Sequence, residues 1–304
     1  MSEHIPHRGV VVGVDGSPSA TAAVRWAAQE AVMRNLPLTV VHAAATLPVA
    51  RSIFAWPAGR VPEEVLEIEE NQAHTIVADA MAAAESDAGL GGGLKIDSQR
   101  YFGSPVATLV ELSKDSHMVV VACRGRSGRH RRLLGSVSTG LLHHAHCPVA
   151  VVHDLNQAVQ SKEAPVLVGV DGSRASELAV SIAFEEASWR GVDLLALHVW
   201  SDAEVSSIPS LEWSALQRVA EKNLAEALAG QQERYPDVGV VRLVEYDNPT
   251  GHLIEHAEQA QLVVLGSHGR GGFAEMFLGS VSATVAQEAH VPVIVARGDE
   301  SRRG

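Results

Sequence analysis

The chain has 304 residues, of which 46% are hydrophobic, 20% are charged and only 4% are aromatic. This composition is typical of a folded chain with room for two domains, and it excludes bulk disorder. Lysines and arginines number 24 against 36 aspartates and glutamates, which gives a formal charge of −12. Such an acidic chain is not expected to bind nucleic acid or anionic membranes in general.

No apolar stretch approaches the roughly 18–20 residues of a membrane span, and residues 1–8 contain no apolar signal-peptide core. The two cysteines, Cys123 and Cys147, are too few for a disulfide framework. We therefore expect a cytoplasmic protein with both thiols reduced.

The sequence contains an internal repeat, with two copies of one pattern. Residues 11–17 read VVGVDGS, and residues 167–173 read LVGVDGS at an offset of 156. Later in each half the offset is 144, since residues 134–138 and 278–282 both read LGSVS. The two offsets differ by twelve residues, which indicates extra chain in the first half, and the Pro- and Ala-containing stretch 45–60 is its expected place.

A polar segment, 154–164, separates the two halves and has the composition of a linker. We therefore predict a first domain over residues 1–153 and a second over residues 165–304.

Each half alternates aliphatic strands with helices. Ala20, Ala23, Ala27 and Ala31 recur at helical spacing, which predicts a helix packed closely on a sheet. The predicted strands are 10–14, 38–42, 95–101, 118–121 and 149–152 in the first half, and 194–198, 239–245, 262–265 and 293–296 among those of the second. The predicted later helices are 62–85, 105–114, 211–231 and 249–259, with a further helix after each glycine-rich loop.

Strands joined by helical crossovers predict an α/β fold. We expect two tandem doubly wound domains, each with a five-stranded parallel sheet of order 3-2-1-4-5 and helices on both faces. Ligands in such sheets bind beyond the carboxyl ends of the strands, so the residues that follow strands one, two and four are the candidates for a site.

A glycine-rich loop follows the fourth strand in each half. In the second half the spacing is Gly266, two residues, Gly269, nine residues, and then Gly279-Ser280 at the start of a helix. Glycines let the backbone approach an anion, and consecutive N–H groups and a helix N-terminus favour phosphate. The alternative is a surface turn followed by an ordinary serine cap. The repeat and the position after strand four favour phosphate.

The first half departs from this spacing at one position, because Ala122 stands where the first glycine is expected. Its loop is also richer in arginine than the second, which has only His268 and Arg270. These arginines could strengthen phosphate binding or face solvent, and they are Arg124, Arg126, Arg129, Arg131 and Arg132.

Other site types find less support. The chain has no Gly-Lys-Ser/Thr loop and no Gly-x-Ser-x-Gly elbow. Residues 269–274 match the dinucleotide fingerprint by letter, but they follow the fourth strand instead of the first. His143, His144, His146 and Cys147 could bind metal, yet we place His143 and His146 in the fourth helix and expect no convergence on a metal.

The VGVDGS openings, the histidine that ends strand two and the Gly-x2-Gly-x9-Gly-Ser spacing together resemble universal stress proteins of the ATP-binding class. The resemblance covers about 8–153 and 165–297, and it is to the tandem form with two such domains in one chain.

The resemblance implies an ATP site in each half, with Mg²⁺ near Asp15 or Asp171, and no catalytic residue. Those aspartates could also form Asx turns, and His42 and His198 are expected to be structural. The implied binding residues of the first half are Gly13, Asp15, Ala43, Ala122, Gly125, Arg126, Gly128, Gly135, Ser136, Val137 and Ser138. Those of the second are Gly169, Asp171, Val199, Gly266, Gly269, Arg270, Gly272, Gly279, Ser280, Val281 and Ser282.

Three functions follow from these observations. The first, a nucleotide-dependent regulator of stress, dormancy or growth, rests on the resemblance. The second is a slow ATPase or phosphotransferase, although no general base is evident beside the loops. The third is a protein-interaction scaffold with vestigial pockets. The resemblance implies that the fifth strands, Val149–Val152 and Val293–Ala296, pair across an interface between the halves, which are expected to form a pseudo-dimer. It also implies a homodimer through the fifth-strand edges and a regulatory protein partner.

Overall fold

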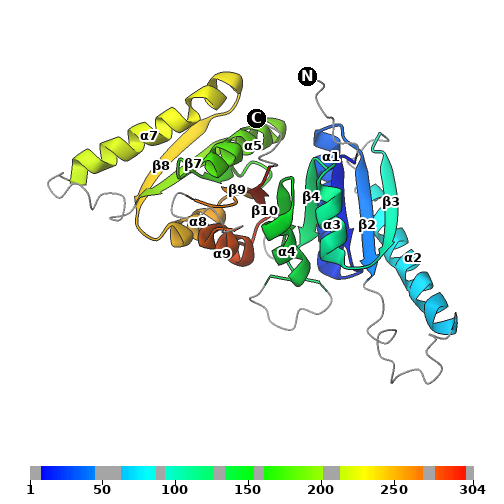
Figure 1. Ribbon diagram of the computed structural model, residues 1–304. Helices are drawn as coiled ribbons and strands as arrows, with labels where there is room; N and C mark the ends of the chain where they lie inside the picture. The colour runs from blue at the N-terminus through cyan, green and yellow to red at the C-terminus, as the bar shows by residue number, and fades with distance from the viewer. Residues whose placement is uncertain are drawn as a thin grey trace. The chain divides into compact units, whose positions relative to one another are not determined.

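The computed structural model describes residues 8–44, 63–86, 93–125, 134–153, 161–200, 213–269 and 278–298. Its contacts divide the chain into two compact units, Met1–Cys147 and Pro148–Gly304. Both units are α/β folds built on parallel strands, as the sequence predicts (Figure 1). No helix in the described ranges is long and apolar enough to span a membrane.

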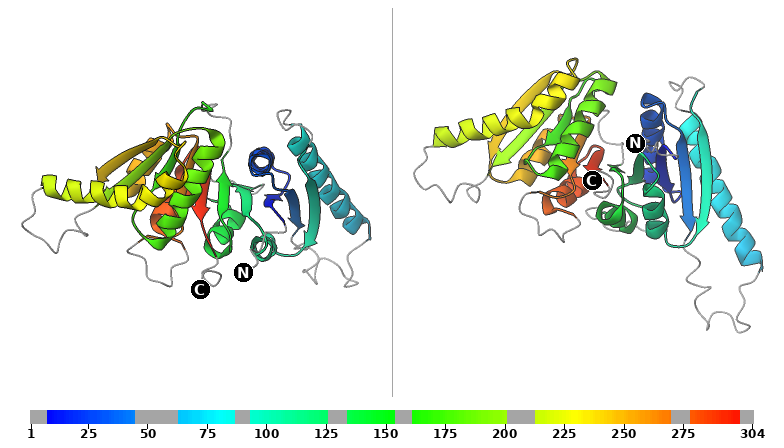
Figure 2. Two further views of the ribbon diagram at one scale, coloured as in Figure 1. Left: turned by 90° about the horizontal axis from the view of Figure 1, so that it is seen from above. Right: turned by 45° about the horizontal axis from the view of Figure 1, so that its top comes forward.

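The first unit holds four parallel strands in the order β3-β2-β1-β4. Helices α1 and α2 cover one face of this sheet, and α3 and α4 cover the other (Figure 2). The elements in chain order are β1 (Val10–Val14), α1 (Pro18–Met33), β2 (Leu38–Ala44), α2 (Glu63–Glu85), β3 (Ile96–Phe102), α3 (Pro105–Ser113), β4 (Met118–Ala122) and α4 (Ser136–His144).

The second unit repeats this arrangement with the predicted strand order, β8-β7-β6-β9-β10. Its elements are β5 (Val149–Val152), β6 (Val166–Gly169), α5 (Arg174–Arg190), β7 (Leu194–Trp200), α7 (Trp213–Arg234), β8 (Val240–Tyr246), α8 (Pro249–Ala257), β9 (Leu262–Gly266), α9 (Ser280–Glu288) and β10 (Val293–Ala296). Strand β5 belongs to this unit and pairs antiparallel with β10, so it occupies one edge of β10.

Local sequence explains why these elements form. The four alanines of the α1 stripe are all buried, and Ser17 caps the helix by accepting a hydrogen bond from the Ala20 N–H at 3.2 Å. Pro18 occupies the first helical turn, where its missing N–H costs nothing. Aliphatic strands covered on both faces then supply the core, which is why so few aromatic residues suffice.

Most predicted elements form within one to three residues of their expected ends. The main difference lies in the second strands, which run two residues beyond the expected histidine. In β2 the added Ala43 and Ala44 pair with Tyr101 and Phe102 of β3. Each second strand therefore continues to pair with the third strand for two residues beyond the histidine, towards the carboxyl edge of the sheet.

The placement of His146 in the fourth helix is wrong. Helix α4 ends at His144, because Ala145 adopts an extended conformation and the His146 N–H donates to Ser113 Oγ at 2.9 Å. His143 lies in the helix as expected. The insertion predicted over 45–60 lies outside the described residues.

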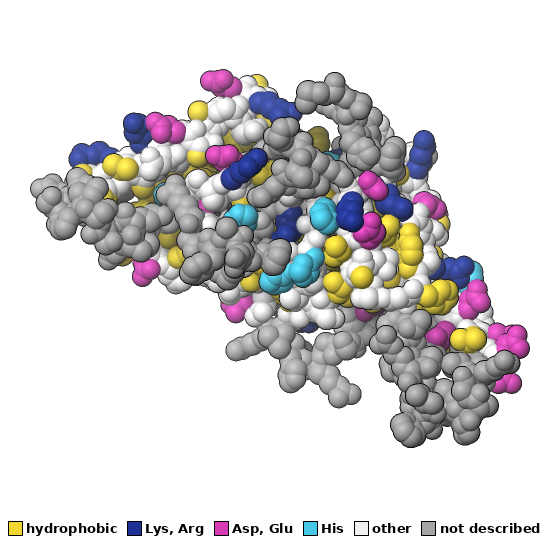
Figure 3. Space-filling model, in the orientation of Figure 1, with side chains coloured by type: hydrophobic (Ala, Val, Ile, Leu, Met, Phe, Trp, Pro, Cys, Tyr) yellow, Lys and Arg dark blue, Asp and Glu magenta, His cyan; other side chains and the backbone are white. Residues whose placement is uncertain are grey.

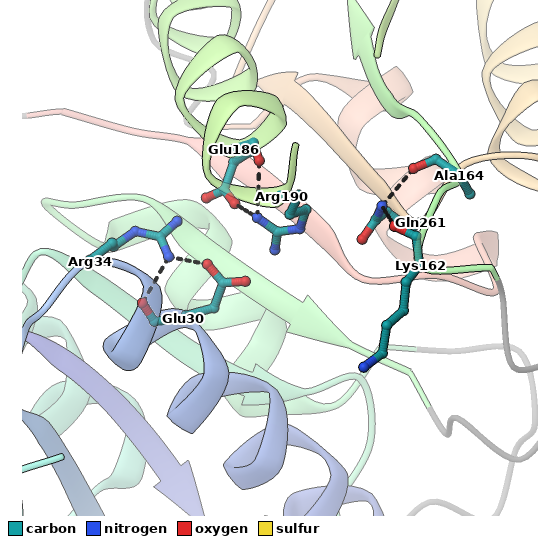
Figure 4. A network of polar contacts seen from close by, with 7 residues as sticks. All are labelled: Glu30, Arg34, Lys162, Ala164, Glu186, Arg190 and Gln261. Atoms are coloured by element: carbon teal, nitrogen blue, oxygen red, sulfur yellow. Dashed lines mark hydrogen bonds and ion pairs between the residues drawn. The ribbon is translucent and has the colours of Figure 1, made fainter. Parts of the chain in front are cut away.

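A buried ion pair recurs at equivalent positions of α1 and α5 (Figure 4). The Arg34 guanidinium donates to the Glu30 carboxylate one turn earlier, and Arg190 donates to Glu186 in the same way. Near the N-terminal end of β9, Gln261 Nε2 donates to two backbone carbonyls, those of Lys162 and Ala164.

Candidate functional site

A cavity of about 270 Å³ lies in the first unit, at the carboxyl ends of β1, β2 and β4. The N-terminal turn of α4 and one side of α3 complete its walls. Its lining consists of Gly13, Val14, Asp15, Ala20, Val41, Ala43, Pro105, Leu109, Val121, Ala122, Arg124, Gly125, Gly135, Ser136, Val137 and Ser138. This is the edge of the sheet at which a ligand is expected.

Nine of the eleven residues proposed for the first half line this one cavity, although they come from four separate stretches of sequence. They are Gly13, Asp15, Ala43, Ala122, Gly125, Gly135, Ser136, Val137 and Ser138. The other two, Arg126 and Gly128, lie outside the described residues.

The Asp15 carboxylate lies between the Ser17 N–H and Gly125. Its Oδ1 accepts a hydrogen bond from the Ser17 N–H at 3.0 Å, which is the Asx turn expected from the sequence. Its Oδ2 lies against Gly125, where an added Cβ would be only 2.5 Å away. Glycine is therefore needed at position 125 because it leaves room for the close approach of this carboxylate.

The N-terminus of α4 presents backbone donors to the cavity. Gly135 is its N-cap and provides no side chain to accept from the first turn. The hydroxyl of Ser138, one of the implied binding residues, donates to the Ala122 carbonyl at 2.7 Å. Since a hydroxyl has one proton, Ser138 ties the helix to β4 and leaves anion binding to the backbone N–H groups.

Arg124 is a lining residue that the resemblance did not assign. Its Nε is buried and has no hydrogen-bond partner in the described part of the chain. A buried guanidinium donor without an acceptor is costly, and an anion in the cavity would satisfy it. The signal was present in the sequence, since Arg124 is the first of five arginines in this loop.

The opposite wall of the cavity is apolar. Val41 and Ala43 of β2 and Pro105 and Leu109 of α3 form it. No motif marks the two α3 residues, because their role depends on α3 packing over the sheet beside β1. The cavity thus has a cationic, donor-rich end and an apolar slot, a combination that suits a molecule with a flat base and a phosphate.

The strand-two histidines have the structural role expected of them. His42 Nδ1 lies 2.8 Å from the Val14 carbonyl, and His198 Nδ1 lies 2.7 Å from the Val170 carbonyl. A carbonyl only accepts, so Nδ1 carries the proton in each ring. The two histidines therefore tie the end of each second strand to the strand beside it.

Ala122 fits its position without backbone strain. Among the described residues the only non-glycine residues with positive φ are Asn35, Asp247 and Asn248, so the φ of Ala122 is negative. Its Cβ lines the cavity instead. The departure from glycine therefore changes the cavity wall and leaves the loop conformation intact.

The second unit reproduces the main contacts. Asp171 Oδ1 accepts from the Ser173 N–H at 2.9 Å, and a Cβ on Gly269 would lie 2.5 Å from Asp171 Oδ2. The Gly279 N–H donates to the Ser267 carbonyl at 2.7 Å, and Ser282 Oγ donates to the Gly266 carbonyl at 2.6 Å.

The remaining candidates of the second unit fall into three groups. Ser280 and Val281 begin α9, whose N-cap is Gly279 and has no side-chain cap. Gly169 and Val199 lie near the carboxyl ends of β6 and β7. Arg270 and Gly272 lie outside the described residues.

Two differences separate the units at this site. Ser176 replaces Ala20, and its Oγ accepts from the backbone N–H groups of Asp171 and Gly172, each at 3.3 Å. Gly266 replaces Ala122, and a Cβ there would lie 2.8 Å from the carbonyl carbon of Ala175. Helix α5 thus approaches the end of β9 too closely for any side chain at Gly266.

Metal ligands do not gather in the described ranges, where no group of three or more histidine, cysteine, aspartate or glutamate side chains is placed to hold an ion. Cys123 and Cys147 are buried and are not joined by a disulfide.

Comparison with known proteins adds the following findings. A family model described as the universal stress protein family matches residues 7–153 and 164–297. The sequence is 50% identical to universal stress protein Rv2623 of Mycobacterium tuberculosis (strain ATCC 25618 / H37Rv) over 298 residues, which cover 98% of this chain and 99% of that protein. It is 49% identical to a universal stress protein of Mycolicibacterium smegmatis (strain ATCC 700084 / mc(2)155) over 299 residues, again 98% and 99% of the two chains.

Among solved structures, a universal stress protein from Archaeoglobus fulgidus DSM 4304 superposes with a TM-score of 0.69 over 98% of this chain and 99% of that one. The two sequences are 21% identical, so this likeness concerns the fold alone.

Proposed function

Because the chain belongs to the universal stress protein family, we propose that it binds ATP in the cavity of the first unit and at the matching loop of the second. In this proposal the bound nucleotide sets the conformation or assembly of a regulator that acts in the cytoplasm in stress, dormancy or growth control. Self-association into a homodimer and an unidentified protein partner belong to the same proposal.

The observation that carries the proposal is the unpartnered Arg124 Nε, buried beside the uncapped N-terminus of α4. A triphosphate at this end would accept from the guanidinium and from the first-turn N–H groups of α4. The adenine would then lie in the apolar slot between Val41, Ala43 and Leu109. A bound Mg²⁺ would neutralise part of the phosphate charge, and Asp15 is the carboxylate in the lining that could hold it.

Binding is better supported than turnover. Asp15 is the only carboxylate among the described lining residues, and its Oδ1 already accepts the Ser17 N–H. A general base must reach the attacking water in a productive pose, and no second acid in the described lining is available for that purpose. We therefore expect hydrolysis, where it occurs, to be slow.

The test is the nucleotide content of freshly purified protein. The protein is acid-denatured, and the released ATP, ADP and AMP are counted per chain. About two ATP per chain would support two sites, and about one would indicate a single working site. Mostly ADP would favour the ATPase.

A variant of the second glycine loop shows whether the second unit holds nucleotide. Gly279→Glu places a carboxylate at the N-cap of α9 and should remove nucleotide from the second unit only. If no nucleotide is released by the native protein and none binds on adding ATP and Mg²⁺, the proposal fails and the scaffold hypothesis becomes the better one.

A further inference from the structure

The first unit has a second cavity, also about 270 Å³, on the other face of the same sheet. Successive side chains of a strand point to opposite faces, so Val41 and Ala43 face the nucleotide cavity while His42 and Ala44 face this one. His42, Ala44, Ser98, Arg100 and Phe102 contribute to its walls, with Glu70 and Ala73 of α2. Nothing in the proposed nucleotide binding uses it.

The internal repeat shows what fills the equivalent position elsewhere. In the first unit Ala44 pairs with Phe102, and in the second Trp200 pairs with Tyr246 in the same register. The Trp200 indole is only 5% exposed and meets the Tyr246 ring edge-on, with centroids 4.7 Å apart. Replacing this tryptophan by Ala44 removes the indole and leaves its partner ring in place.

Phe102 has Ala44 opposite it, whereas Tyr246 has Trp200. Phe102 is 72% exposed, the largest exposed fraction among the large hydrophobic residues that the structure describes. A flat aromatic ring lying over Ala44 would cover Phe102 as Trp200 covers Tyr246. Aromatic pairs of this kind stabilise beyond the area that they bury.

Two charged side chains in the cavity wall indicate which charged groups a ligand would carry. Arg100 and Glu70 both line the cavity, and neither has an ion-pair or hydrogen-bond partner in the part of the chain that the structure describes. Arg100 suits a carboxylate, and Glu70 suits an ammonium group. Acidic side chains gather around the first turns of α2, next to this cavity (Figure 3). A ligand with a net negative charge is therefore disfavoured there, whereas a zwitterion is not.

We propose that this cavity binds a free aromatic amino acid, with tryptophan as the best fit. Its ring takes the place that the Trp200 indole occupies in the second unit, its carboxylate meets Arg100 and its ammonium group meets Glu70. The site is separate from the nucleotide cavity and lies on the opposite face of the sheet.

The test is a titration of the full-length protein with free 5-fluorotryptophan, followed by ¹⁹F NMR line width and shift. We expect saturable binding with half-saturation at or below about 1 mM. Indole, tryptamine and indole-3-propionate compete in separate titrations, and each should bind at least about tenfold more weakly because it lacks one or both charges.

Three variants test the placement, and the nucleotide content of each should equal that of the native protein. Phe102→Ala and Arg100→Gln change exposed side chains and should each weaken binding by about tenfold. Ala44→Trp copies the second unit and should abolish binding. Val241→Ala, at an exposed position on β8, is the control and should bind normally.

Absence of saturation would overturn the proposal. So would Phe102→Ala and Arg100→Gln variants that bind as the native protein does, because the ligand would then lie elsewhere. Equal affinity for indole and tryptophan would overturn the assignment of Arg100 and Glu70. If Ala44→Trp does not fold, the two exposed-residue variants decide the result.

Discussion

At the scale of the residue, the absence of a Cβ at Gly125 and the Asp15 carboxylate define one end of the first cavity. From the sequence, Gly125 was interpreted as a residue that lets the backbone approach an anion closely. The structure adds a second reason, because Asp15 Oδ2 occupies the space that a Cβ would need. Asp15 cannot move aside freely, since its Oδ1 accepts the Ser17 N–H.

Gly125→Ala should therefore reduce nucleotide binding. The new Cβ would displace the Asp15 carboxylate from its Asx turn, and we expect ATP affinity to fall by at least about tenfold. The measurement is the dissociation constant for ATP in the presence of Mg²⁺. Gly230→Ala is the matched control, because an added Cβ there meets nothing within 4 Å and Ala favours the α7 helix. Unchanged affinity in Gly125→Ala would show that the position of Asp15 does not matter for binding.

His117 is a buried histidine of the first unit with a lowered pKa. Burial and, to a smaller extent, the nearby Arg34 guanidinium together lower the pKa of His117 from 6.5 to about 4, against a smaller opposite effect of Glu30. The equivalent residue of the second unit is Gln261, which does not titrate. Both residues donate their backbone N–H to the loop before the first strand, to Gly9 in one unit and to Pro165 in the other.

This depressed pKa makes the folded protein sensitive to acid. The unfolded chain binds a proton on His117 below about pH 6.5, whereas the folded chain resists it down to about pH 4, so stability is lost as the pH falls through that window. Between pH 7 and pH 4.5 the native protein should lose roughly 2–3 kcal/mol more unfolding free energy than His117→Gln. Urea denaturation at both pH values measures the difference. Equal losses would mean that His117 is protonated in the folded state.

At the scale of the element, one buried ion pair lies at the C-terminal end of each of α1 and α5. The side chains of Glu30 and Arg34 are 1% and 2% exposed. A surface pair of similar spacing, Glu111 and Lys114, is 72% and 44% exposed. Water screens the second pair and not the first, so the two should respond very differently to truncation.

Glu30→Ala should cost about 3–5 kcal/mol of unfolding free energy, because it removes a carboxylate that the buried Arg34 guanidinium contacts. Replacing both Glu30 and Arg34 by methionine should cost much less, since no uncompensated charge remains. Glu111→Ala should cost less than about 1 kcal/mol. Urea denaturation compares the three variants. A double variant as unstable as Glu30→Ala would locate the cost in lost packing instead of in charge.

The fourth strands end differently in the two units, and the adjacent helix explains why. A Cβ on Gly266 would lie 2.8 Å from the Ala175 carbonyl carbon and 2.9 Å from the Ser176 nitrogen. These are backbone atoms of the first turn of α5, which cannot rotate away. Gly266→Ala should therefore destabilise the protein by about 1–3 kcal/mol, whereas Ala122→Gly should cost about 1 kcal/mol or less. Thermal unfolding of both variants tests this, and equal costs would contradict it.

At the scale of the whole molecule, the most consequential feature is the pairing of β5 with β10. The first compact unit ends at Cys147, and β5, the next strand in the chain, pairs antiparallel with β10. Val149, Ala150 and Val151 pair with Val295, Ile294 and Val293, and all six side chains are fully buried. The resemblance implied that the fifth strands pair across an interface, and the structure pairs them antiparallel within one chain.

Ala150→Asp should release this pairing. A carboxylate in the middle of β5 would be buried opposite Ile294, and we expect a loss of about 3 kcal/mol or more of unfolding free energy. Hydrogen exchange should then show reduced protection of the β10 amides. Val241→Asp, at a half-exposed position on β8, is the control and should cost no more than about 1 kcal/mol. Unchanged protection of β10 would mean that β5 contributes little to it.

The sequence by itself determined the tandem α/β fold and the identity of most residues around the first cavity. Aliphatic runs, helical alanine spacing and the repeated glycine loops are local patterns, and local patterns can be read without a structure. Arg124, Pro105 and Leu109 were not assigned, because their roles depend on which elements pack together. Only the tertiary structure brought Asp15 against Gly125, fixed the antiparallel register of β5 on β10, and set Ala44 opposite Phe102 where the repeat has Trp200 and Tyr246. Those contacts join residues far apart in the chain, and their distances are fixed by packing, which no local pattern specifies.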